Sequence, residues 1–133
     1  MATVTVKGLK PLIAAFYAAG RDAPRFAAKA LHEEAQEAFV LSQAIVPVDL
    51  GVLRASGVVH PPVYSGTKAT VWITYGGAAA DYAIYVHEFP PSRARHAAPT
   101  RWKYLEYPVK LHSRDMAARM TARVLDMINR RFA

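Results

Sequence analysis

The alternation of apolar and polar positions predicts a short strand and two helices in the first third of the chain. Residues 3–6 (TVTV) alternate as the residues of a strand do. A helical apolar stripe follows, and Gly20 is placed to cap its C-terminal end. Asp22 suits the N-cap of a longer helix that runs to about Ile45, because the residue before Pro47 avoids the α region. The stripe of the short N-terminal helix consists of Leu9, Leu12, Ile13 and Phe16.

The long helix is predicted to bury one alanine-rich side, against which another backbone can pack closely. That side comprises Ala27, Leu31, Ala35, Ala38, Leu41 and Ile45. The predicted solvent side comprises Lys29, His32, Glu33, Gln36, Glu37 and Gln43.

The middle of the chain is predicted to form an antiparallel hairpin. Residues 52–60 are predicted as a strand, and residues 69–75 give the clearest strand pattern of the chain. In the second strand Val71, Ile73 and Tyr75 share one face, because side chains alternate along a strand. The turn-rich residues between the two runs favour a hairpin connection.

The last third of the chain is predicted to hold a long loop and a C-terminal helix. Residues 89–100 contain three prolines, which is typical of a loop. A helix is predicted from Val109 almost to the end, with arginines on its exposed side. Its apolar stripe comprises Val109, Met116, Met120, Val124 and Met127. Its exposed arginines are Arg114, Arg119, Arg123, Arg130 and Arg131.

These elements predict one α+β domain that spans residues 1–133. A small antiparallel sheet packs against one long helix, with a short N-terminal helix and a C-terminal helix. Apolar residues make up 53% of the 133, which is enough for an ordinary core. The absence of cysteine excludes disulfides and thiolate chemistry. The opening residues lack a signal-peptide pattern and no apolar run is long enough to span a bilayer, so we expect no membrane association.

The net charge of +7 is distributed unevenly along the sequence. Residues 1–92 carry seven basic and seven acidic side chains, whereas residues 93–133 carry ten basic and three acidic ones. A basic C-terminal third suits an acidic protein partner, nucleic acid, or only solvent. The basic side chains that suit contact with a partner are Arg93, Arg95, Arg101 and Lys103.

The residue spacings that mark common active sites are missing. His32-Glu33 and His87-Glu88 each open a zinc motif, but Gln36 stands in the second histidine position of the first and Pro91 in that of the second. The carboxylates of Asp49, Asp81 and Glu88 are the candidates for a small hydrolase, although turns and salt bridges explain such residues more often. We therefore expect no catalytic residue, no metal and no cofactor.

Three segments resemble one known family, the tail-completion (head–tail joining) proteins of tailed phages. Residues 46–56 read VPVDLGVLRAS, residues 82–88 read YAIYVHE, and residues 103–108 read KYLEYP. Each is similar to a family segment at the corresponding place in the chain. The matching positions in the first segment are Val46, Pro47, Val48, Asp49, Gly51, Leu53, Arg54 and Ser56. Those in the other two are Tyr82, Tyr85, Val86, His87, Glu88, Leu105, Glu106 and Pro108.

The resemblance implies a structural virion protein of a long-tailed bacteriophage, with no enzymatic activity. Copies would form a ring, a hexamer or a dodecamer, in the neck between the head connector and the tail. Neighbours would be a connector or stopper protein and a tail-terminator or tail-tube protein, and DNA would pass through the lumen without specific binding. The subunit would reside in the host cytoplasm before assembly. We also expect Arg54 to pair with Asp49 or Glu88. The alternative function is a basic nucleic-acid-binding viral protein.

Overall fold

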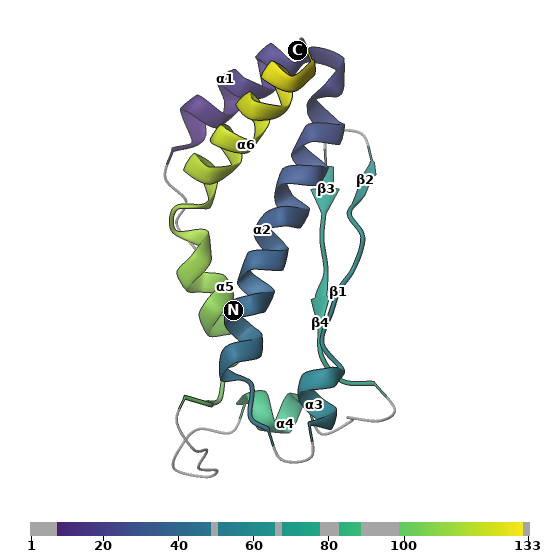
Figure 1. The fold of residues 1–133 in the computed structure, drawn as a ribbon, viewed down its shortest axis with the longest axis vertical. Helices are drawn as coiled ribbons and strands as arrows, with labels where there is room; N and C mark the ends of the chain where they lie inside the picture. The colour runs from purple at the N-terminus through teal and green to yellow at the C-terminus, as the bar shows by residue number, and fades with distance from the viewer. Residues whose placement is uncertain (1–7, 49–50, 66–67, 78–82, 89–98, 132–133) are drawn as a thin grey trace.

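Helical residues run without interruption from residue 9 to residue 45, a stretch of 37 residues. It consists of α1 (Leu9–Ala19), a 3-10 turn η1 (Gly20–Asp22) and α2 (Ala23–Ile45), and the chain turns at η1 (Figure 1). Gly20 has φ 61°, a backbone conformation that favours glycine. The prediction of a separate short N-terminal helix is therefore wrong, because η1 joins those residues directly to the long helix. The end of α2 at Ile45 is as predicted.

The computed structural model describes residues 8–48, 51–65, 68–77, 83–88 and 99–131. In addition to the N-terminal run, its helices are α3 (Val52–Ala55), α4 (Ala83–Glu88), α5 (Glu106–Ser113) and α6 (Met116–Arg131). Its strands are β1 (Val58–Val59), β2 (Val63–Ser65), β3 (Lys68–Thr70) and β4 (Ile73–Thr74). The fold is mostly helical α+β, and the predicted N-terminal strand lies outside the described residues.

The main core lies where α1 and α6 pack together across the N-terminal half of α2 (Figure 1). Small side chains at the contact let the helices approach closely. The buried members are Leu12, Ala15, Ala19, Phe26, Ala30, Ala117, Met120 and Val124. The predicted stripe of α1 is only half buried, because Leu9 and Ile13 each remain 51% exposed on the side that α6 does not cover.

Helix α2 lies between two layers instead of burying a single face. The hairpin packs along one side of it, and α5 and α6 pack along the other (Figure 1). Its buried residues therefore include Glu34 and Ser42 as well as alanines. The prediction of one solvent side is wrong, because α5 and α6 cover part of the side that carries Glu33 and Glu37.

The four strands form one long antiparallel hairpin in two pieces. β1 pairs with β4 through Val58↔Thr74, and β2 pairs with β3 through Val63↔Thr70. Between the two paired pieces, the first arm advances by four residues, from 59 to 63, whereas the second arm advances by only three, from 70 to 73. The first arm therefore carries one extra residue, a bulge, at the two prolines 61–62, which have no N–H to donate to a partner strand. The predicted hairpin is confirmed.

Two predicted boundaries are wrong for local reasons. Residues 52–55 form α3 instead of a strand, because Gly51 at φ 79° starts a helical turn and the Ser56 hydroxyl closes it by donating to the Leu53 carbonyl at 2.5 Å. The predicted C-terminal helix is two helices. The Ser113 hydroxyl donates to the Lys110 carbonyl at 2.8 Å, and a side chain that satisfies the backbone in this way competes with helix continuation.

The α1–α6 core predicts the effect of a matched pair of truncations on α6. Val124 is completely buried whereas Leu125 is 45% exposed. Val124→Ala should therefore lower the free energy of unfolding by about 2 kcal/mol, because it removes two buried carbon atoms and leaves a cavity. Leu125→Ala removes more carbon but should cost less than half as much. Urea unfolding at an unchanged m-value measures the loss of unfolding free energy in both variants. Equal losses would contradict the assignment of Val124 to the core.

Candidate functional site

The family-like segments come together at the C-terminal end of α2. We call this region the joint: the end of α2, α3, α4 and residues 99–106, which lead into α5. Its buried centre consists of Val46, Leu53, Ala83 and Tyr104. These residues come from four separate stretches of sequence, so their packing holds those stretches together at the lower end of the molecule (Figure 1).

Tyr104 connects three of these stretches by hydrogen bonds. Its hydroxyl donates to the Ala83 carbonyl at 2.8 Å, and its carbonyl accepts from the Ser42 hydroxyl at 2.6 Å. Its ring stands nearly perpendicular to the rings of Tyr75 and His87, at centroid distances of 5.1 and 5.0 Å. The hydroxyl and the carbonyl of this buried tyrosine are therefore satisfied, and its ring orientation is fixed.

Backbone hydrogen bonds hold the segment before α5 in place. The N–H of Arg101 donates to the Ile45 carbonyl at the end of α2, at 2.9 Å. The N–H of Lys103 donates to the His87 carbonyl at 2.8 Å. Lys103 adopts φ 55°, a conformation that side-chain-bearing residues rarely occupy, so surrounding contacts must over-determine it.

An ionic group covers the outer side of the joint. The ammonium of Lys103 contacts a carboxylate oxygen of Glu88 at 2.5 Å and one of Glu106 at 3.0 Å. Hydrogen bonding to Lys103 lowers the pKa of both carboxyl groups, and hydrogen bonding to Glu88 raises the pKa of Lys103. His87 accepts the Glu106 N–H at Nε2, 3.2 Å away, and its Nδ1 lies 2.9 Å from Glu88. Together these contacts fix α4 against the start of α5.

The other family-like positions of the described part are structural. Gly51 makes the turn into α3, and the Ser56 hydroxyl accepts the Gly76 N–H at 2.9 Å, which ties α3 to the end of the hairpin. Leu105 packs against the buried centre of the joint, and Pro108 is buried in the first turn of α5. Pro47 is half-buried and Val48 is exposed.

Several predicted contacts involve residues outside the described part of the chain. Asp49, Asp81, Tyr82, Arg93 and Arg95 lie outside the described residues, as do the side chains of Tyr85 and Val86. The predicted pair of Arg54 with Glu88 is wrong, since Glu88 contacts Lys103 and His87. Of the basic residues expected to face a partner, Lys103 is held by two carboxylates, and the Arg101 guanidinium lies 4.0 Å from the Tyr107 ring centroid.

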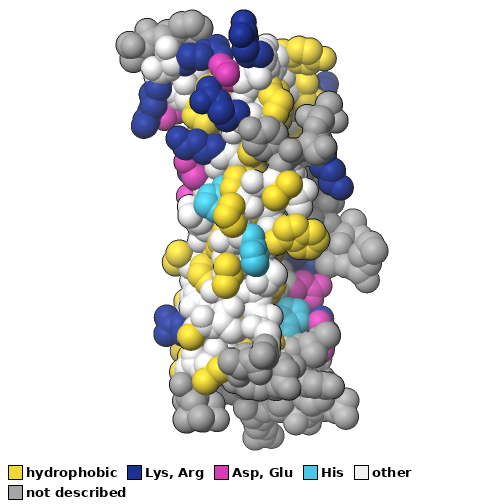
Figure 2. All heavy atoms as spheres, turned by 90° about the vertical axis from the view of Figure 1, so that its right-hand side faces the viewer, with side chains coloured by type: hydrophobic (Ala, Val, Ile, Leu, Met, Phe, Trp, Pro, Cys, Tyr) yellow, Lys and Arg dark blue, Asp and Glu magenta, His cyan; other side chains and the backbone are white. Residues whose placement is uncertain are grey.

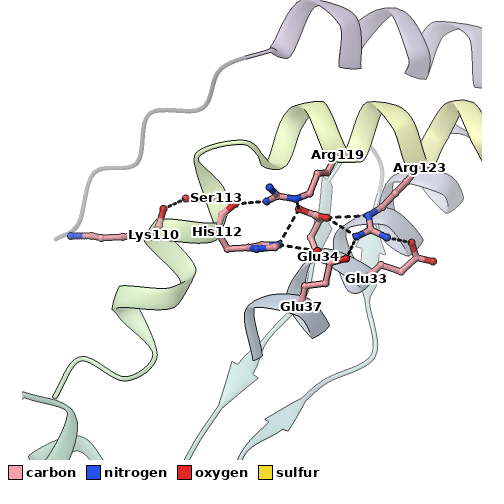
Figure 3. Close-up of polar contacts among 8 residues, drawn as sticks. All are labelled: Glu33, Glu34, Glu37, Lys110, His112, Ser113, Arg119 and Arg123. Carbon is pink, nitrogen blue, oxygen red and sulfur yellow. Dashed lines mark hydrogen bonds and ion pairs between the residues drawn. The ribbon is translucent and has the colours of Figure 1, made fainter. Parts of the chain in front are cut away.

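A second polar cluster lies between α2, α5 and α6 (Figure 3). We call it the carboxylate–arginine cluster; its members are Glu33, Glu34, Glu37, His112, Arg119 and Arg123. Glu34 is only 1% exposed, and it accepts from Arg119 Nε at 2.8 Å and from Arg123 Nε at 3.0 Å. Arg123 also donates to Glu33 at 2.9 Å and to Glu37.

These hydrogen bonds stabilise the charged form of Arg123, the arginine at the centre of the cluster. Burial lowers the pKa of Arg123, but hydrogen bonds to Glu37 and Glu34 outweigh it and leave the pKa above its usual value. The prediction that Arg119 and Arg123 are exposed is wrong, because both neutralise carboxylates of α2. The sequence did carry a signal for this pairing. One helix has three acidic residues at i, i+1 and i+4, and another has two arginines at i and i+4; like charges at such spacings repel one another within a helix. The repulsion is relieved when the acidic helix packs against the basic one.

Several basic side chains outside this cluster gather at one end of the molecule (Figure 2). We call this the basic end: the region where η1, the start of α2 and the end of α6 meet, and Figure 2 shows Lys and Arg side chains crowded there. Its basic residues are Arg21, Arg25, Lys29, Arg130 and Arg131. Asp22 accepts from Arg131 and Arg25, which lowers its pKa. The charge division along the sequence is therefore not the charge division in space.

No family model, curated protein or solved structure matches this chain. The resemblance to tail-completion proteins thus depends on short sequence segments alone. Among the described residues, no helix combines the length and the hydropathy needed to cross a membrane.

The ionic group on the joint predicts an acid-sensitive contribution to stability. The pKa values of Glu88 and Glu106 are lowered in the folded chain, so their contribution is present above the ordinary carboxyl pKa of about 4.3 and is lost as the pH falls through the lower folded values. Lys103→Met should therefore make the fall in unfolding free energy between about pH 5 and pH 3 shallower. Arg130→Met, at an exposed pair, is the control and should keep the wild-type slope. Identical slopes for all three proteins would contradict the assignment.

The carboxylate–arginine cluster predicts a large effect from one charge deletion. Arg123→Met leaves the buried Glu34 carboxylate with Arg119 as its remaining arginine, and it should cost about 3 kcal/mol of unfolding free energy. Arg130→Met removes an exposed pair with Asp126 and should change stability by about 0.5 kcal/mol or less. Urea unfolding at neutral pH compares the two variants; a similar small loss in both would show that Glu34 does not depend on Arg123.

Proposed function

We propose that this chain is a structural subunit of a ring in the neck of a long-tailed bacteriophage, where it joins the head connector to the tail. The resemblance of the joint segments to tail-completion proteins supports this function. The observation that carries it in the structure is a pair of exposed apolar surfaces on different elements. A ring of identical subunits requires two different patches on each subunit, one contacting the other on the neighbour.

The first surface, which we call the α1 stripe, consists of Leu9, Ile13 and Tyr17. These residues are four apart and thus lie on one side of the helix, and they are 51, 51 and 84% exposed. Helix α6 packs on the side of α1 that carries Leu12. The apolar surface of α1 extends beyond that side, and among the described residues nothing buries the rest of it. Such a surface is typical of an interaction site.

The second surface, which we call the hairpin face, consists of Val58, Val63 and Trp72. All three are exposed on the two-piece hairpin, and Trp72 is 63% exposed. Figure 2, which views the molecule from the hairpin side, shows hydrophobic side chains along its middle. Aromatic residues such as Trp72 commonly anchor protein interfaces.

In this proposal the α1 stripe of one subunit contacts the hairpin face of the next, and the contact repeats until the ring closes. A connector or stopper protein lies on one side of the ring, and a tail-terminator or tail-tube protein lies on the other. DNA passes through the lumen. The subunit acts through shape and charge and catalyses no reaction, and it resides in the virion after assembly in the host cytoplasm.

The basic end favours a second candidate, a nucleic-acid-binding viral protein. Guanidinium groups from three elements gather there, and phosphates are bound by such groups. Duplex DNA binding that weakens steeply with salt would favour this candidate over the ring subunit. The same binding should then fall in an Arg21→Ala, Arg25→Ala double variant.

The ring proposal predicts a specific pattern of association for two surface variants. Ile13→Ser, Tyr17→Ser destroys the α1 stripe, and Val63→Ser, Trp72→Ser destroys the hairpin face. Each variant alone should be monomeric at concentrations where the wild-type chain associates. An equimolar mixture should give dimers and stop there, because each variant keeps one intact patch. Analytical ultracentrifugation measures all three samples.

Leu111→Ser provides the control, because Leu111 is exposed on α5 and belongs to neither surface; it should associate like the wild type. Wild-type protein that stays monomeric at millimolar concentration, or variants that associate unchanged, would contradict the proposed contact. Electron microscopy of phage particles that lack this chain tests the function itself. Heads and tails should remain separate.

A further inference from the structure

The carboxylate–arginine cluster contains a buried imidazole nitrogen that lies between two carboxylates without a hydrogen bond to either of them. His112 is 13% exposed, but its Nε2 is fully buried and makes no hydrogen bond within the described structure. It points toward Glu34 and Glu37, whose nearest oxygens lie 3.2 and 3.3 Å away (Figure 3). These distances are within ion-pair range, yet neither oxygen is aligned to form a hydrogen bond. A cation bound between the three groups would satisfy this nitrogen and both carboxylate oxygens.

We propose that Glu34, Glu37 and His112 bind a divalent transition-metal ion of the zinc class, which connects α2 to α5. The three ligand atoms are Glu34 Oε1, Glu37 Oε2 and His112 Nε2, and one atom from each residue lies within 4.8 Å of the others. Zinc bonds of about 2.0–2.2 Å in tetrahedral geometry separate neighbouring ligands by about 3.3–3.6 Å. The two nitrogen–oxygen distances are close to that separation.

The arginines hold the carboxylates in the orientation that such a site needs. Arg119 Nε donates to Glu34 Oε1, and Arg123 holds the other Glu34 oxygen and Oε1 of Glu37. Glu37 Oε2 is thereby turned toward His112, and Glu34 Oε1 keeps a second lone pair for a ligand bond. Hydrogen-bonded carboxylates of this kind are common around protein metal ions, where they fix the ligand geometry.

The net charge of the cluster favours the binding of a cation. Three carboxylates face two guanidinium groups, so the cluster with a neutral His112 has a net charge of −1. One imidazole nitrogen and two carboxylate oxygens form a mixed donor set that suits zinc, cobalt or nickel better than magnesium, which requires octahedral oxygen coordination. A water molecule completes the four-coordinate site.

Metal titration of the untagged full-length chain tests this proposal. Zn²⁺ should bind with a stoichiometry of one and raise the thermal midpoint by several degrees, whereas Mg²⁺ at the same concentration should not. Co²⁺ should give the visible absorption of a four-coordinate site, and Zn²⁺ should abolish that absorption. This readout reports on the ligands directly and does not depend on the function proposed above.

His112→Ala should weaken Zn²⁺ binding at least tenfold and remove the Co²⁺ spectrum. His32→Ala is the matched control on α2, outside the cluster, and should bind like the wild type. Glu37→Gln keeps the buried Glu34 and His112 and provides a second test if His112→Ala does not fold; it too should lose at least tenfold. The proposal would be overturned if the wild type showed no saturable Zn²⁺ binding at 100 μM. Equal binding by wild type, His112→Ala and Glu37→Gln would overturn it as well. Either result would mean that the cluster holds no metal and that His112 Nε2 carries at most a proton.

Discussion

The buried carboxylate of Glu34 is the constraint that orders the helical half of this molecule. An isolated carboxylate in that position would be prohibitively costly, so charged partners must come to it. Arg119 and Arg123 supply them from α6, and this fixes both the position and the rotation of α6 on α2. With α6 held in that rotation, Ala117, Met120 and Val124 face α1, and the apolar core between α1 and α6 can close. The specificity of the packing therefore comes from charge, and most of its favourable energy from burial.

The joint provides a second constraint, at the C-terminal end of α2. There the connections are neutral hydrogen bonds: Ser42 to the Tyr104 carbonyl, Tyr104 to the Ala83 carbonyl, and Arg101 N–H to the last turn of α2. Each satisfies a polar group that burial would otherwise leave unpaired. α2 is thus held at its middle by ion pairs and at its C-terminal end by backbone-directed hydrogen bonds, with the hairpin along its side. A chain built in this way presents its exposed surfaces on a rigid frame.

Local patterns predicted the elements, and long-range pairing decided what the elements bury. The end of α2 before Pro47 and the hairpin could be predicted from residues close together in sequence, because proline geometry and strand alternation are local. The roles of Glu34 and Arg123 could not, since they are 89 residues apart and each looks solvent-exposed on its own helix. The same holds for the joint: its segments could be picked out by resemblance, but the contact of Lys103 with Glu88 requires the fold. α3 was missed because the Ser56 hydroxyl, not hydrophobic periodicity, closes that turn.

Internal pairing also determines where the charge of the molecule can act. Arg119, Arg123 and Lys103 are neutralised by acids from their own chain, so much of the excess of the C-terminal third never reaches the surface as free charge. Arg130 and Arg131, from the same third of the chain, lie with Arg21 and Arg25 at the basic end. If subunits associate side by side through the α1 stripe and the hairpin face, equivalent ends lie at the same rim, and the basic ends form a continuous positive edge. Repulsion along this edge opposes ring closure at low ionic strength and is relieved by salt or by a polyanionic partner. The partner at that rim is therefore expected to be acidic, because contact with it would add to the stability of the ring itself.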